Sequence, residues 1–202
     1  MDDISACGPA NEAVGRARGG LFMGLFGGLW WFAGLQLQHT AALWPYALNG
    51  LLTLALAGAC MRLRQQAAAQ AVADPAASRR IGRAFLWINV TQWGSIFVVT
   101  QALTALHLAA WIYPAVIAIV GLHFLPLARV FRYPPHLPTG IALLLWALIF
   151  PRLLKDAAGP LSAYGPFGAG TILWSATAWI IWHQRGWLRH RIGADRQPIR
   201  QV

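Results

Sequence analysis

The sequence predicts an all-α membrane protein, a polytopic transmembrane helical bundle. Of its 202 residues, 57% are hydrophobic and only 11% are charged, whereas an average soluble domain carries about 25% charged residues. So few charges cannot cover a water-soluble surface, and much of the surface is therefore expected to contact lipid. The apolar residues also occur in long runs, and a helix needs about 20 such residues to cross a bilayer.

Six apolar runs are read as spanning helices, together covering residues 20–184. Their approximate ranges are 20–38, 44–61, 84–105, 109–128, 138–154 and 166–184. The third and fourth runs are nearly continuous, so the segment TALHLAAWIYP must contain a reversal around His107. Asp74 and Pro75 suit the N-cap and first position of a helix, so the third helix is expected to begin before the membrane.

The fifth run is the shortest and lies between Pro138 and Pro151. Short or proline-broken membrane segments can indicate a binding site. A tilted filler helix is the alternative interpretation, and the sequence leaves both open.

The basic residues predict the orientation of the helices. If the N-terminus is cytoplasmic, fourteen of the sixteen Lys and Arg residues lie on the cytoplasmic side, and only Arg152 and Lys155 lie outside. The positive-inside rule describes such a bias. We therefore expect a cytoplasmic N-terminal tail at 1–19, three in-out-in hairpins and a basic cytoplasmic tail at 185–202. This basic tail either contacts anionic lipid headgroups or serves only to retain the topology.

The first residues are acidic and have no early apolar core, so no cleaved signal peptide is expected. The net charge of +10 comes from residues that flank apolar runs, so nucleic-acid binding is not expected. The acidic residues all lie in tails, in a loop or at the outer edge, at Asp2, Asp3, Glu12, Asp74, Asp156 and Asp195. This leaves no carboxylate for an intramembrane proton relay or a hard-cation site. Cys7 and Cys60 alone make no zinc site, and no metal or other cofactor is expected.

The polar residues within the apolar runs are mostly neutral. Asn89 and Gln92 share a face of the third helix, while Asn49 lies in the second and Ser175 in the sixth. Such side chains form hydrogen bonds between helices in lipid. Alternatively, they line a cavity for a neutral or weakly polar ligand between helices two, three, four and six.

Residues 121–128 read GLHFLPLA and place a titratable and a helix-breaking residue in the fourth run. Pro126 has no N–H, so the carbonyl of Leu122 needs another donor, and a kink is expected there. His123 is predicted to point into the bundle, either as a hydrogen-bonded structural residue or as a ligand contact. His183 is its expected ionisable companion, and two histidines on different helices would also suit haem.

The segment GLHFLPLARVF, within residues 107–132, resembles the signature of a bacterial family of small, multi-span inner-membrane proteins of uncharacterised function. The resemblance implies a helical bundle in a bacterial inner membrane. It implies no activity and no catalytic residues.

Gly20, Gly24 and Gly28 form a tandem G-x-x-x-G series on one face of the first helix. Small residues let helix backbones approach closely in lipid. The face is predicted to pack within the bundle, with a dimer contact as the alternative.

These features favour a small transporter or ligand-binding membrane protein with a neutral polar intramembrane cavity. One alternative is an accessory or structural subunit that acts through helix–helix contacts, with a second copy or another membrane protein as its partner. Another is a membrane-embedded enzyme or haem-binding protein that uses His123. No nucleophile elbow, Walker loop or H-E-x-x-H motif is present, so no catalytic residue is assigned. Membrane lipids are the expected partners.

Overall fold

The computed structural model describes residues 9–70, 75–131, 133, 135–153 and 161–194. Its elements in chain order are α1 (Pro9–Leu37), α2 (Trp44–Ala68), α3 (Pro75–Ala105), the short 3-10 helix η2 (Ala109–Trp111), α4 (Ile112–Val130), α5 (His136–Leu153) and α6 (Leu161–Ala194). These ranges contain no β-strand. The prediction of an all-α chain is confirmed for this part of the chain.

The first and last helices extend beyond the apolar runs that predicted them. α1 begins at Pro9 and α6 continues to Ala194, so parts of the expected tails at 1–19 and 185–202 are helical. An apolar run marks only the portion of a helix that suits lipid. The helical backbone can continue beyond that portion through polar residues.

The third helix also begins before its apolar run, as the sequence suggested. Pro75 is its first residue, a position where the missing proline N–H costs no helical hydrogen bond. Asp74, the expected N-cap, lies outside the described residues.

The chain reverses after α1 and after α3 through the same kind of turn. His39 and His107 have positive φ angles of 50° and 57°. In each turn the histidine N–H donates to the carbonyl three residues earlier, at 3.0 Å. The N–H of the next residue donates to the carbonyl five residues earlier, at 3.3 Å after His39 and 2.8 Å after His107. This pair of bonds defines a Schellman motif, with a histidine where glycine is usual.

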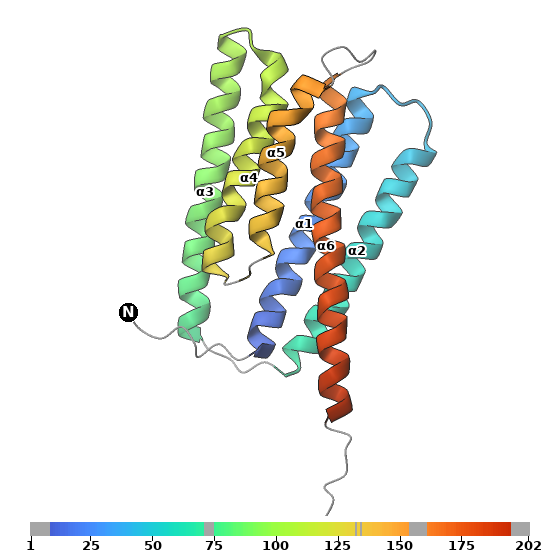
Figure 1. The fold of residues 1–202 in the computed structure, drawn as a ribbon, viewed down its shortest axis with the longest axis vertical. Helices are drawn as coiled ribbons and strands as arrows, with labels where there is room; N and C mark the ends of the chain where they lie inside the picture. The colour runs from blue at the N-terminus through green and yellow to red at the C-terminus, as the bar shows by residue number, and fades with distance from the viewer. Residues whose placement is uncertain (1–8, 71–74, 132, 134, 154–160, 195–202) are drawn as a thin grey trace, which may run out of the picture.

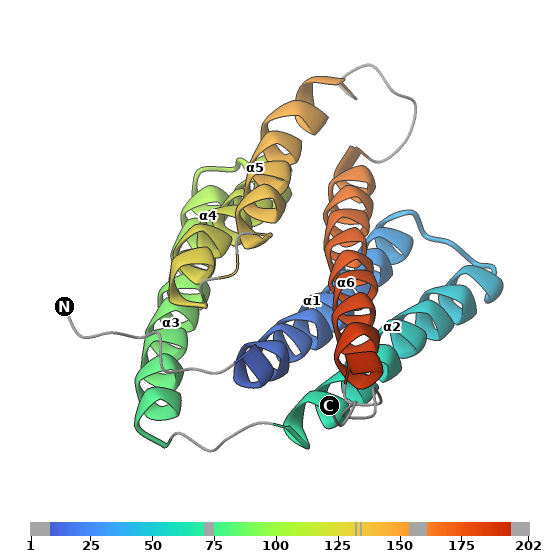
Figure 2. The same cartoon turned by 60° about the horizontal axis from the view of Figure 1, so that its bottom comes forward.

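The helices form two groups of three (Figure 1). α1 packs between α2 and α6, while α4 packs between α3 and α5. Contacts of α6 with α4 and α5 join the groups, and the turned view in Figure 2 shows them side by side. Successive helices run in opposite directions, so α1 begins and α6 ends at one end of the bundle, called the basal end below.

Two of the closest helix contacts are formed by reciprocal pairs of glycines. A Cβ atom added at Gly170 of α6 would lie 2.8 Å from the carbonyl oxygen of Gly27 on α1. A Cβ atom added at Gly140 of α5 would likewise lie 2.8 Å from the carbonyl oxygen of Gly121 on α4. Real Cβ atoms do not approach this closely, so these crossings depend on glycine on both helices.

Large apolar side chains occupy both the inside and the outside of the bundle. The inner cluster includes the fully buried Ile117, Leu143 and Leu173. On the outside, Leu54 is 69% exposed and Phe97 is 66% exposed. Because soluble proteins rarely expose large contiguous apolar patches, this outer surface suits lipid.

Length and composition make three helical stretches suitable for crossing a membrane: Ala10–Leu37, Trp44–Ala68 and Ala109–Val130. The stretch His136–Arg152 is apolar but shorter. The protein is thus a helical bundle with three apolar helices of membrane-spanning length among the residues described.

Candidate functional site

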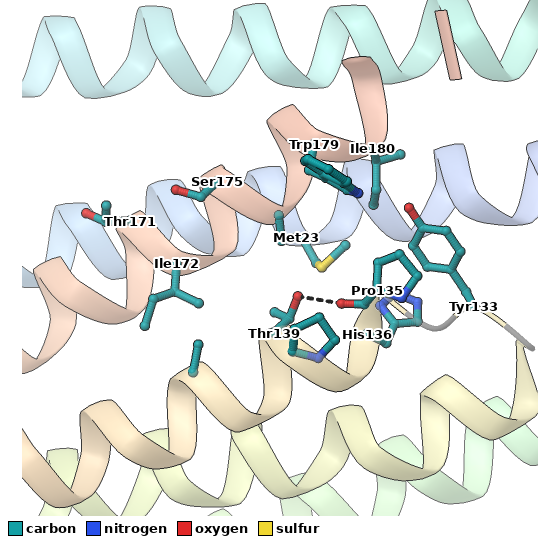
Figure 3. Close-up of a pocket in the computed structure, with 13 residues that line it drawn as sticks. Met23, Tyr133, Pro135, His136, Thr139, Thr171, Ile172, Ser175, Trp179 and Ile180 are labelled. Atoms are coloured by element: carbon teal, nitrogen blue, oxygen red, sulfur yellow. Dashed lines mark hydrogen bonds between the residues drawn. The ribbon is translucent and has the colours of Figure 1, made fainter. Parts of the chain in front are cut away.

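A groove of about 660 Å³ lies between α5 and α6 (Figure 3). Its walls come from α1, the α4–α5 connection, α5 and α6, through Met23, Tyr133, Pro135, His136, Pro138, Thr139, Ala142, Thr171, Ile172, Ser175, Ala176, Trp179 and Ile180. This space, called the α5–α6 groove below, is within the size range of small-molecule sites, about 300–1,000 Å³. Its lining is mostly apolar, as in such sites.

The buried polar residues of the groove gather where α5 begins, towards the basal end, while Thr171 and Ser175 of the lining are exposed on α6. Tyr133 is 4% exposed and His136 is 5% exposed. The Thr139 hydroxyl is also buried and donates a hydrogen bond of 3.0 Å to the Pro135 carbonyl oxygen, drawn in Figure 3. No Asp, Glu, Lys or Arg side chain belongs to this lining, so the described wall of the groove is neutral.

His136 is held by aromatic rings rather than by hydrogen bonds of its side chain. Its ring centroid lies 5.1 Å from that of Tyr133 and 5.7 Å from that of Phe124. Its Nδ1 atom is buried and has no hydrogen-bond partner among the described residues. The ring is therefore positioned by packing against neighbouring aromatic side chains.

Arg16 of α1 lies over the ring of Tyr133 and outside the described lining of the groove. Its guanidinium carbon lies 5.2 Å from the centre of the Tyr133 ring, and its Nη2 forms a salt bridge of 2.7 Å with Glu12. Burial raises the pKa of Tyr133 above its usual value, although the nearby Arg16 charge opposes this shift. The Tyr133 hydroxyl therefore remains neutral around pH 7.

The structure brings few of the sequence-predicted ligand residues together. Ser175 lines the α5–α6 groove. Asn49 instead donates to the Gly28 carbonyl oxygen on α1 at 3.2 Å, and Asn89 donates to the Phe85 carbonyl oxygen of its own helix at 2.8 Å. The groove thus lies between α1, α5 and α6, and Ser175 is the one candidate ligand residue present in its described lining.

The remaining candidates also lie outside the lining of the groove. Gln92 is half-buried on α3. His183 is exposed and stacks on Trp179, with ring centroids 6.3 Å apart.

His123 is half-buried on α4 and faces α3. It lies beside the backbone of Ile88 on α3, and its buried Nδ1 atom has no hydrogen-bond partner among the described residues. α4 continues as a helix through Pro126 to Val130.

The tandem glycines of α1 lie against α2 and α6. Their carbonyl oxygens, which no side chain shields, accept hydrogen bonds from neighbouring helices. The single proton of the Thr177 hydroxyl lies between two carbonyl oxygens, that of Leu173 on its own helix at 2.9 Å and that of Gly20 at 3.3 Å. Asn49 donates to the Gly28 carbonyl oxygen at 3.2 Å. Between them, Trp174 donates to the Gly24 carbonyl oxygen at 3.1 Å. This face is used within the bundle.

Sequence reasoning missed His136 and Tyr133, which supply the buried polar end of the groove. Both lie in YPPHLPTG, mostly before residue 138, where the fifth apolar run was predicted to begin. Three prolines within this short stretch hold the connection in a restricted set of conformations. That signal was available in the sequence.

No cluster of three or more His, Cys, Asp or Glu side chains that would hold a metal ion occurs within the described ranges. Comparisons with models of protein families, with curated proteins and with solved structures find no match for this chain.

Proposed function

We propose that this chain is a ligand-binding protein of a bacterial inner membrane that takes a small, mainly apolar molecule from the bilayer into the α5–α6 groove. The proposal extends to six spans with both termini cytoplasmic. In that arrangement the groove would be reached from the lipid. Binding of this kind also suits a small transporter, which would release the same ligand on one side of the membrane.

The observation that carries the proposal is a groove of ligand size whose described wall is neutral and mostly apolar. The wall includes Met23, Ile172 and Ile180, with Tyr133, His136 and Thr139 as its polar residues at the start of α5. Ligand pockets typically combine a hydrophobic lining with a few polar groups that orient the ligand. The side-chain amides of Asn49 and Asn89 lie outside this wall and donate to backbone carbonyl oxygens.

Photolabelling tests this proposal. The purified protein in lipid nanodiscs is irradiated with an uncharged apolar photoprobe over a range of concentrations, and labelled peptides are identified by mass spectrometry. We expect saturable labelling of α5 and α6. Ala176 lines the groove and Ala178 is exposed on the same helix, so Ala176→Phe should remove the saturable labelling while Ala178→Phe should preserve it.

Labelling that rises linearly with probe concentration, or that responds equally to both substitutions, would show that the groove binds no apolar ligand. The two variants introduce the same side chain into the same helix. A difference between them therefore reports on filling of the groove rather than on a general effect of added bulk.

A further inference from the structure

The α5–α6 groove is apolar along its length and has cationic side chains just beyond one end. Along α6 its lining runs from Thr171 to Ile180, about 14 Å at 1.5 Å per residue. Tyr133 and Trp179 lie at the same end of the groove in Figure 3, which is the end towards the basal end of the bundle. Each of these two aromatic side chains contacts a basic residue that lies outside the lining.

The two basic residues come from different helices. The guanidinium carbon of Arg16, on α1, lies 5.2 Å from the centre of the Tyr133 ring. His183, one helical turn beyond Trp179 on α6, is exposed and stacks on Trp179, with ring centroids 6.3 Å apart and an interplanar angle of 7°. Arg16 and His183, called the basal pair below, therefore mark the basal limit of the groove.

The surroundings of the basal pair favour a negatively charged group. Glu12 is the only acidic residue in the described part of the chain, and it is paired with Arg16. Arginines occur near the basal ends of five helices, among them Arg62 and Arg185, whereas Arg152 is the only described arginine at the opposite end. Such an excess of one sign attracts anions to this end of the bundle and repels cations.

The aromatic side chains indicate the depth at which a headgroup would lie in a bilayer. Trp182 is 69% exposed and its ring centroid lies 5.4 Å from that of Trp179. Exposed tryptophan side chains are enriched at the boundary between hydrocarbon and headgroups. At this boundary a charged group keeps contact with water, so it does not pay the large cost of entering an apolar space. The groove itself then lies at the depth of the hydrocarbon.

We propose that the α5–α6 groove binds an anionic amphiphile, with its alkyl chain along α6 and its acidic headgroup beside Arg16 and His183. This inference rests on the proposed function and names its ligand class. The chain would contact Ile172, Ala176 and Trp179 of the lining. Arginine forms charge-assisted hydrogen bonds with phosphate and carboxylate groups, so the headgroup competes with Glu12 for Arg16.

The experiment measures competition against the uncharged apolar photoprobe, with the full-length protein in nanodiscs of phosphatidylcholine. The competitors share one alkyl chain and differ in charge: hexadecyl phosphate, hexadecanol and hexadecyltrimethylammonium. We expect hexadecyl phosphate to compete about tenfold more effectively than hexadecanol, the usual effect of a hydrogen bond to a charged group. Hexadecyltrimethylammonium should compete less well than hexadecanol. Inorganic phosphate alone should not compete, because it has no chain to fill the groove.

Matched charge variants locate the headgroup. Arg16→Gln should weaken hexadecyl phosphate about tenfold and leave hexadecanol unchanged, whereas Arg16→Lys should retain most of the preference. Arg62→Gln removes an exposed basal charge from α2, which contributes no residue to the described lining, and should change neither competitor. Glu12→Gln frees Arg16 and should strengthen hexadecyl phosphate roughly twofold. His183→Phe keeps a ring against Trp179 and should weaken hexadecyl phosphate alone. Circular dichroism establishes that each variant retains its helices.

The outcomes separate this inference from the proposed function. If the photoprobe labels no groove residue saturably, the proposed function itself is wrong. If labelling is saturable and lost in Ala176→Phe, yet hexadecanol competes as well as hexadecyl phosphate, the groove binds apolar molecules and the proposal of an anionic headgroup is wrong. Equal effects of Arg16→Gln and Arg62→Gln would show a general attraction to the basic surface, and competition by inorganic phosphate would show an anion site without a chain. Either result would also overturn the proposal.

Discussion

The indole N–H of Trp174 on α6 donates a hydrogen bond of 3.1 Å to the carbonyl oxygen of Gly24 on α1. The bond is possible because Gly24 has only a hydrogen in place of a side chain, which leaves its carbonyl oxygen uncovered. Gly24 is also buried at the contact between the helices. Trp174 also stacks on Trp31 of α1, with centroids 5.5 Å apart and an interplanar angle of 9°. The residue thus joins α1 to α6 by a hydrogen bond and by ring packing.

Trp174→Phe separates these two contributions. Phenylalanine keeps an aromatic ring against Trp31 but has no N–H, so the free energy of unfolding should fall by about 0.6–1.7 kcal/mol, the usual range for an interhelical hydrogen bond in a membrane protein. Reversible unfolding in mixed detergent micelles measures the change. Trp87→Phe on the exposed face of α3 is the control and should stay near the wild-type value.

Gly24→Leu and Gly28→Leu should disrupt the packing of α1. A Cβ atom at Gly24 would lie 3.4 Å from Thr177, and one at Gly28 would overlap the side chain of Thr53. The longer leucine would force the helices apart, at a cost of about 1–3 kcal/mol or more. Gly94 has no neighbouring atom within 4 Å of an added Cβ, so Gly94→Leu should be tolerated. Wild-type melting temperatures for both α1 variants would disprove this packing.

The turn between α3 and α4 should become more stable when His107 is replaced by glycine. The left-handed conformation at this residue, with φ of 57°, costs a non-glycine residue about 1–2 kcal/mol, whereas glycine adds about 0.5–1 kcal/mol of unfolded-state entropy. His107→Gly should therefore raise the free energy of unfolding by about 0.5–1 kcal/mol. His107→Val, which tolerates the left-handed region poorly, should lower it. The opposite order of the two variants would refute this reading of the turn.

His123→Ala is expected to change stability rather than ligand binding. The imidazole lies beside the backbone of Ile88 on α3, outside the groove lining. Its removal should lower the free energy of unfolding by about 1–3 kcal/mol because truncating the half-buried ring removes its packing against α3. Saturable photolabelling of α5 and α6 should persist at wild-type affinity. A loss of labelling without a loss of stability would assign His123 to the ligand site instead.

Reporter fusions should place both termini in the cytoplasm. The expectation rests on the fourteen basic residues that a cytoplasmic N-terminus would leave inside and on the positive-inside rule. A phosphatase reporter, active only outside, should be inactive after Val202 and active when inserted within residues 155–165. A cytoplasmic fluorescent reporter should show the converse pattern. An active phosphatase after Val202 would require another topology.

Local features of the sequence were sufficient to predict the helices and several of their ends. The long apolar runs and the low share of charges predicted an all-α chain, Pro75 suited the start of the third helix, and the reversal around His107 follows from the length that a bilayer allows. These properties depend on neighbours along the chain. The polar continuation of α1 to Pro9 and of α6 to Ala194 carried no apolar signal, so both helices were predicted too short.

Only the tertiary structure decided which polar residues meet. Asn49 and Asn89 look equally suited to a cavity in sequence, yet the rotation and crossing of the helices direct Asn49 to a glycine carbonyl on α1. The same packing brings His136, from a short proline-rich connection, beside residues of α6 that follow it by about forty positions in the sequence. Helical periodicity specifies the face of a helix on which a side chain lies. Which helix packs against that face depends on close backbone contacts, such as the one between Gly27 and Gly170, and these form only when the helices assemble.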